Sequence, residues 1–273
     1  MLITSNPHTH STYVDGKNTL EEMIEAALDL GFTALGFSEH ARQTVDLPYG
    51  LSLENEIKYI ENVKLLQKKY EGKIKIWLGI ERDRMSVADK TRYEYILAAN
   101  HYLISEDGEC AGVDSTDLIG PWVEKHMAGD WMKAARTYFS QYADYVVSIK
   151  PDLIAHLDLI CKGNRKNHWF DEESEEYLSY AKSAMDKMIS VCKVMEVNTG
   201  GIARSNQPCP YPILPLLSHW KKLGGEVIPA SDCHRAHQLG SYFEECPKYL
   251  KEAGFDRMLT LGTGDKLFEV VKL

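Results

Sequence analysis

Two histidines separated by one residue, His8 and His10, lie directly after the first apolar stretch of the chain. Side chains two residues apart on an extended strand point to the same face, so both imidazoles are expected to face the same way. Two such rings can bind one divalent ion. Pairs of this kind also occur on ordinary strands, so the interpretation depends on what the rest of the chain supplies.

Other imidazole and carboxylate groups lie in the same loop or follow later apolar stretches. They occur in Ser38-Glu39-His40, Gly79-Ile80-Glu81, Ala155-His156 and Ser231-Asp232-Cys233-His234. With the first pair they make nine candidate metal ligands: His8, His10, Asp15, His40, Glu81, His101, His156, Asp232 and His234. Mixed imidazole and carboxylate sets suit zinc, manganese and iron.

Apolar stretches with strand character recur along the chain, and most are followed by a longer segment of helical period. This alternation is typical of parallel β/α units. The seven strand candidates are residues 2–6, 34–37, 74–80, 95–99, 153–155, 194–197 and 227–230. An eighth, residues 258–261, is either a barrel strand or an accessory strand.

The expected helices carry recognisable start signals and apolar stripes. Thr19 and Glu22 form a capping box, and Gly31 lies where that helix would end. Further helices are expected after Leu53 and over residues 131–147, 174–191 and 214–223. Residues 106–120 are polar and contain glycine, which predicts a long mobile loop that is a candidate lid.

The predicted arrangement brings the nine ligand-type residues together. In a parallel barrel the C-terminal ends of the strands converge on one face, where active sites of this architecture lie. If each histidine were a separate core residue, six of the ten in the chain would occupy equivalent positions by coincidence. Convergence therefore predicts a metal cluster at one mouth of a β/α barrel.

Composition narrows the class of partner. The chain has 273 residues, 44% apolar and 26% charged, and a length that suits one barrel domain over residues 1–273. A net charge of −9 disfavours binding to nucleic acid or to an anionic membrane and favours a small substrate. Since no apolar run approaches the roughly 20 residues of a spanning helix, and no signal-peptide pattern follows Met1, a cytoplasmic protein is expected.

Taken in chain order, these motifs resemble those of the polymerase and histidinol phosphatase (PHP) family. The resemblance covers nearly the whole chain and implies a distorted (β/α)7 TIM-like barrel that holds three divalent ions. It is strongest to the histidinol-phosphatase branch, whose features are seen in His156-Leu157-Asp158-Leu159-Ile160, Asn198-Thr199-Gly200-Gly201 and Lys251-Glu252-Ala253-Gly254-Phe255.

The resemblance also implies how the ligands are shared. The first ion would be held by His8, His10, Glu81 and Asp232. The second would share Glu81 and add His101 and His156, and the third would take Asp15, His40 and His234. Among these residues, Glu81, Asp232 and His234 are expected to take part in catalysis.

The implied reaction is hydrolysis of a phosphomonoester, with histidinol phosphate of histidine biosynthesis as the favoured substrate. Two ions sharing a water lower its pKa and supply hydroxide, while the ions offset charge on the phosphoryl and leaving oxygens. Arg42 and Arg204 are candidates for binding the phosphate, as is Lys162, which follows the Asp-Leu-Ile run where the branch often has arginine. Lysine in place of arginine is one departure from the branch, and Ala41-Arg42-Gln43 after the second strand is another. Both departures concern which substrate is bound more than which reaction is catalysed.

Three alternatives stay open. A phosphatase of the same family could act on another small ester, because loops around a metal cluster select the leaving group. Amidohydrolase-like barrels also use a histidine pair, but His234 adds a ligand that their two-metal plan does not need. A non-catalytic regulatory module would be expected to have lost ligands, whereas all nine positions here carry competent residues.

Overall fold

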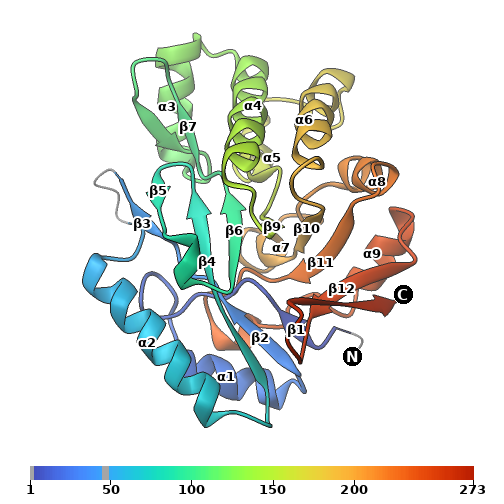
Figure 1. Cartoon of the computed structure of the whole chain (residues 1–273). Coiled ribbons are helices and arrows are strands. Elements are labelled where there is room, and N and C mark those ends of the chain that lie inside the picture. The colour runs from blue at the N-terminus through green and yellow to red at the C-terminus, as the bar shows by residue number, and fades with distance from the viewer. Residues whose placement is uncertain (1–2, 45–48) are drawn as a thin grey trace.

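A seven-stranded parallel sheet forms the centre of the molecule (Figure 1). This computed structural model describes residues 3–44 and 49–273. The strand order is β1 (Ser5–Asn6), β2 (Ala34–Phe37), β4 (Lys75–Asp83), β6 (Tyr95–Ala99), β9 (Leu153–Ile154), β10 (Val194–Asn198) and β11 (Glu226–Ala230). Each adjacent pair is parallel. All seven expected strands are therefore present, although Leu2 lies outside the described residues.

The ends of this sheet meet at its C-terminal edge. Thr9, just beyond β1, forms a parallel bridge with Cys233, just beyond β11. The His10 amide donates to the Cys233 carbonyl at 2.8 Å, and the Cys233 amide donates to the His8 carbonyl at 3.0 Å. The sheet is thus a nearly closed barrel. The backbone groups that close it belong to the predicted ligands His8 and His10 and to Cys233, which lies between the predicted ligands Asp232 and His234.

Most of the helices cover the outside of the barrel, and one short helix, Gly200–Ser205, lies at its C-terminal mouth (Figure 1). The helices are α1 (Leu20–Asp29), α2 (Leu53–Lys69), α3 (Thr116–Met127), α4 (Trp131–Ile149), α5 (Asn164–Asn167), α6 (Glu175–Met188), α7 (Gly200–Ser205), α8 (Leu214–Lys222) and α9 (Cys246–Glu252). The capping box of Thr19 and Glu22 forms as predicted. Gly31 has a φ of 74°, which an L side chain rarely adopts, and the helix ends there.

The barrel interior is filled by side chains from alternate strand positions. Tyr95 belongs to this interior cluster, and its hydroxyl donates to the Pro7 carbonyl at 2.5 Å. A Cβ at Gly79 would lie 2.2 Å from the Tyr95 ring, and one at Gly36 would lie 2.3 Å from its hydroxyl. Two adjacent strands therefore need glycine so that one aromatic ring can close the barrel beneath the C-terminal mouth.

The eighth strand candidate is an accessory strand. Residues Arg257–Leu261 form β12, which pairs antiparallel with β13 (Phe268–Lys272) and not with the seven-stranded sheet. The Leu261 amide donates to the Ser5 hydroxyl at 2.9 Å, which ties β12 to β1. Leu259 and Leu261 join the interior cluster, so this hairpin packs at the end of the barrel away from the ligands.

The prediction of a long loop over residues 106–120 is wrong. β7 (Tyr102–Ile104) and β8 (Cys110–Gly112) form an antiparallel hairpin, and α3 begins at Thr116. The strands are too short for hydrophobic periodicity to reveal them. A separate two-stranded antiparallel sheet pairs β3 (Arg42–Gln43) with β5 (Ser86–Val87) beside β4. Short 3-10 turns occur at η1 (Lys90–Arg92), η2 (Leu159–Cys161) and η3 (Ala236–Gln238).

Candidate metal centre

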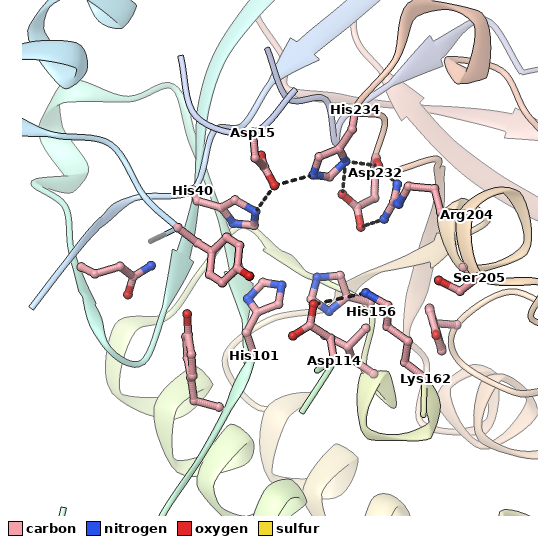
Figure 2. A pocket seen from close by; sticks show the side chains of 16 residues that line it. Asp15, His40, His101, Asp114, His156, Lys162, Arg204, Ser205, Asp232 and His234 are labelled. Atoms are coloured by element: carbon pink, nitrogen blue, oxygen red, sulfur yellow. Dashed lines mark hydrogen bonds and ion pairs between the residues drawn. The ribbon is translucent and has the colours of Figure 1, made fainter. Parts of the chain in front are cut away.

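All nine predicted ligands lie at the C-terminal mouth of the barrel. Figure 2 shows six of them around one cavity. Donor atoms fall into four overlapping groups, within each of which they lie within 4.8 Å of one another. The groups are His10, Asp15, His40 and His234; His8, Glu81 and His156; His8, His10 and Asp232; and His40, Glu81 and His101. Each of these groups could hold a metal ion.

Glu81 occupies the middle of the cluster. It shares one face of β4 with Trp77 and Gly79, so strand alternation directs its carboxylate into the barrel mouth. One carboxylate oxygen lies 3.0 Å from Nε2 of His156, and the other lies 2.6 Å from Nδ1 of His40. The carboxylate therefore faces both halves of the cluster, as a bridging ligand would.

Several buried donor atoms of the cluster have no hydrogen-bond partner among the described residues. They are Nε2 of His8, both ring nitrogens of His10, Oδ1 of Asp15 and Nδ1 of His156. Buried polar atoms are nearly always satisfied, and leaving one unpaired costs about 1–3 kcal/mol. Borderline and hard cations are the species that imidazole and carboxylate lone pairs of this kind accept. The donor set therefore fits divalent metal ions.

The electrostatics act differently on different donors of the cluster. Burial lowers the pKa of His8 and of His40, but nearby carboxylates outweigh it and raise the pKa of His8 above its ordinary value and that of His40 to about 10, so a metal ion would have to displace protons from these two rings. Burial, helped by the rings of His234 and His40, lowers the pKa of His10 to about 3, so its ring stays neutral. Burial by itself raises the pKa of Glu81, but the charges of His40 and His8 outweigh it and hold that pKa well below its ordinary value. A neutral imidazole beside an ionised carboxylate is the state that a metal ion needs.

Asp232 is held in an uncommon backbone conformation. Its φ is 46°, in the left-handed region that non-glycine residues seldom adopt. Arg204 donates from one guanidinium nitrogen to the Asp232 carboxylate at 2.7 Å and from another to the Asp232 carbonyl. These bonds aim the other carboxylate oxygen at Nε2 of His10, 3.3 Å away. This uncommon backbone conformation thus places a candidate metal ligand.

Two carboxylates that the sequence reasoning missed orient ligand histidines. Glu196 accepts from Nδ1 of His8 at 2.8 Å, and Asp83 accepts from Nδ1 of His101 at 2.8 Å. Each contact leaves the Nε2 atom of the same ring facing Glu81, at 3.5 and 3.6 Å respectively. Carboxylates behind metal-bound histidines fix the tautomer and ring orientation. The available signal was an ionisable residue inside a buried strand, as in Met195-Glu196-Val197.

The cavity has a second wall made by loops and a short helix. Lys162 follows η2, Arg204 lies in α7, and both line the cavity with Asp114, which follows β8 (Figure 2). Nζ of Lys162 lies 3.2 Å from a carboxylate oxygen of Asp114. The cavity volume is about 260 Å³. Drug-sized ligands occupy pockets of about 300–1,000 Å³, so this one suits a small molecule.

Arg42 is not part of that wall as the described residues form it. It begins β3, its side chain is 45% exposed, and its Nε lies 3.9 Å from the carboxylate of Glu56. Arg42 is absent from the described residues that line the cavity. Of the three candidates for phosphate binding, the structure brings Arg204 and Lys162 to the cavity and leaves Arg42 outside it.

A nearly closed seven-stranded barrel with this cluster at its C-terminal mouth is a metal-binding α/β barrel. The family model described as the PHP domain matches residues 6–200. The chain therefore belongs to the PHP domain family, as its motifs predict.

Among the described helices, none is long and apolar enough to cross a membrane.

Relatives and solved structures extend the match over most of the chain. A Deinococcus radiodurans protein named a probable histidinol-phosphatase is 25% identical over 93% of this chain and 94% of its own length. The HisK structure from Listeria monocytogenes superposes with a TM-score of 0.73 at 18% identity, covering 89% of this chain and all of that one. Histidinol phosphate phosphatase from Lactococcus lactis gives 0.66 at 19% identity, covering 98% and 100%. The barrel fold is thus shared.

Proposed function

We propose that this chain is a metal-dependent phosphomonoesterase that hydrolyses histidinol phosphate to histidinol and phosphate. The observation that carries the proposal is the convergence of nine metal-ligand side chains, several with buried unpaired donor atoms, beside two cationic side chains. Phosphoryl transfer to water requires a phosphate held beside the metal ions, and cationic side chains next to the cluster can hold it there.

Three divalent ions suit the ligand sets, with zinc, manganese and iron as candidates. His8, His10, Glu81 and Asp232 would hold the first. Glu81, His101 and His156 would hold the second, and Asp15, His40 and His234 the third. The donor groups support part of this division, because His8, His10 and Asp232 form one group and Asp15, His40 and His234 belong to another. Glu81 forms one group with His8 and His156 and a second group with His40 and His101.

Bound divalent ions in such a site lower the pKa of water and offset charge on phosphoryl oxygens. The protein residues supply the remaining requirements. Arg204 presents its guanidinium, anchored on Asp232, at the edge of the cavity where a phosphate would lie. Lys162 adds a point charge from η2. His8 and Glu81 are at most 1% exposed, so this side of the cluster is shielded from bulk water.

Relatives support the choice of substrate. The Deinococcus relative carries the name of a histidinol-phosphatase, and the Lactococcus structure contains zinc, L-histidinol and phosphate. The cavity of about 260 Å³ is also consistent with a small phosphorylated metabolite. The alternative within the family is a phosphatase for a different small ester. It would use the same metal chemistry and would differ only in the loops and the short helix that line the cavity.

Metal removal tests the reaction. Protein stripped by a chelator and verified metal-free by elemental analysis should lose phosphatase activity. Activity should return when zinc, manganese or iron is added back, because the unpaired donors then regain their partner. Full activity in verified metal-free protein would reject a metal-dependent mechanism.

A substrate panel tests the choice of ester separately. Phosphate release should be fastest from histidinol phosphate, compared at equal concentration with serine phosphate, glycerol phosphate and p-nitrophenyl phosphate. If histidinol phosphate were no better than these esters while all of them required metal, the phosphatase assignment would stand and the substrate assignment would be wrong.

A further inference from the structure

Asp114 is a carboxylate in a cavity proposed to receive a phosphate. It lines the cavity but belongs to none of the four donor groups that the described residues form. Placing like charges next to each other is unfavourable in a partly buried site. A phosphatase has no need of this carboxylate for phosphate binding, and its presence therefore points to a positive charge in the ligand.

The Asp114 carboxylate is held firmly relative to the metal centre. The Val113 amide donates to the carbonyl of the predicted ligand His101 at 2.8 Å, which ties the end of β8 to the cluster. A Cβ at Gly112 would lie 3.3 Å from Oδ1 of Asp114, so the carboxylate rests against the strand backbone. Figure 2 shows it beside His101 and His156, across the cavity from Asp15 and His234.

The partner of Asp114 is a residue that a phosphate would also attract. Nζ of Lys162 lies 3.2 Å from Oδ2 of Asp114, and the backbone carbonyl of Lys162 accepts from the Gln207 side chain at 3.0 Å. The backbone of Lys162 is thus anchored while its flexible side chain can reorient. Both side chains are partly exposed, 37% for Asp114 and 29% for Lys162, and pairs of this kind exchange partners at little cost.

We propose that Asp114 binds the ammonium group of an amino-alcohol phosphate ester and selects such esters over uncharged ones. This inference rests on the proposed function and names the group that recognises its substrate. In histidinol phosphate the carbon bearing the ammonium is bonded to the CH₂ that carries the ester oxygen. One substrate thus brings a dianion and a cation a few bonds apart. Asp114 releases Lys162 to the phosphate and takes the ammonium, so one ion pair becomes two.

Two substrates and two variants test the inference. The substrates are histidinol phosphate and its deamino analogue, 3-(imidazol-4-yl)propyl phosphate, which differ only in the ammonium. Asp114→Asn should lower kcat/KM for histidinol phosphate roughly ten- to a hundred-fold more than for the analogue, as expected for a lost charge-assisted contact. Asp117→Asn removes the same charge at an exposed position in the first turn of α3 and should leave both values unchanged.

Other outcomes separate the possible errors. If Asp114→Asn slowed both esters equally, the residue would only position Lys162, and the ammonium contact would be wrong. Equal kcat/KM for the two esters in the wild-type enzyme would also overturn ammonium recognition while leaving the phosphatase assignment intact. If the metal-loaded enzyme hydrolysed neither ester, the proposed substrate would be rejected, and this inference with it. Metal content, measured for each variant, guards against effects on the cluster.

Discussion

The cavity has two walls that differ in origin and in solvent exposure. The donor wall consists of the nine predicted ligands, and those nearest the barrel axis are almost fully buried: His8 and His10 are 0% exposed and Glu81 is 1% exposed. The loop wall consists of Asp114, Lys162 and Arg204, whose side chains are 27–37% exposed. A mostly buried wall that we propose holds the metal ions thus faces a more exposed wall that we propose contacts the substrate.

This difference teaches where substitutions should act. On the donor wall, removing one ligand leaves others buried without a partner, because each donor belongs to a group of at least three. On the loop wall, solvent can replace a lost contact, so each residue acts on substrate binding one contact at a time. Substitutions in the donor wall should therefore abolish the reaction, and those in the loop wall should change its efficiency and selectivity.

The largest effect is expected for Glu81→Gln. The amide keeps the shape of the side chain but removes the charge that faces His40 and His156. Loss of residues that merely support metal ligands costs about 10- to 100-fold in metal affinity or activity. A central ligand should therefore cost more than about a hundred-fold in kcat, with less metal bound, as kinetics and elemental analysis would measure.

Glu61→Gln is the matched control for that variant. Glu61 lies exposed on α2, away from the cavity lining, and its replacement makes the same change of charge and shape. It should leave metal content and turnover at wild-type levels. Normal turnover and full metal content in Glu81→Gln would contradict the bridging role and with it the central feature of the donor wall.

The next largest effect is expected for Glu196→Gln. Glu196 lies behind the donor wall, where it contacts the candidate ligand His8. Glu196 accepts from Nδ1 of His8 at 2.8 Å and from the His156 amide at 2.6 Å. The variant should lose about 10- to 100-fold in metal affinity, because the His8 ring is no longer held in one orientation. Titration of stripped protein with zinc measures this. Wild-type affinity would mean that the carboxylate only fills the core.

The donor wall could be predicted from the sequence, and the loop wall only in part. Candidate ligands such as Glu81 lie near the C-terminal ends of parallel strands, and these ends converge on one face whatever the loops do. The contact between His8 and Glu196 joins residues 188 apart, and no local pattern encodes that pairing. Asp114 lies in a segment predicted to be a loop, since strands of three residues such as β8 carry too little periodicity.

Arg204 should give an intermediate effect, because it belongs to the loop wall but also supports a ligand. Its guanidinium donates to the Asp232 carboxylate at 2.7 Å. Arg204→Ala should lower kcat/KM roughly ten- to a hundred-fold, as expected for about 1.5–3 kcal/mol from a charge-assisted hydrogen bond. Inhibition by inorganic phosphate should weaken in parallel. If elemental analysis showed full metal and kcat/KM stayed at the wild-type value, the phosphate contact would be rejected.

The smallest effect is expected for Arg42→Ala, which tests where the loop wall ends. The Arg42 side chain is 45% exposed, and its only described ion pair is with Glu56, at 3.9 Å. Glu56 stays paired without it, because Arg92 lies 2.9 Å from one carboxylate oxygen and the Tyr93 hydroxyl donates to that oxygen at 2.9 Å. Exposed pairs contribute about 0–1 kcal/mol. The free energy of unfolding should therefore fall by less than about 1 kcal/mol in chemical denaturation, and kcat/KM should change by less than about threefold. Arg204→Ala in the same assays provides the comparison. A tenfold loss of kcat/KM in Arg42→Ala at full metal content would place Arg42 on the phosphate and extend the loop wall to β3.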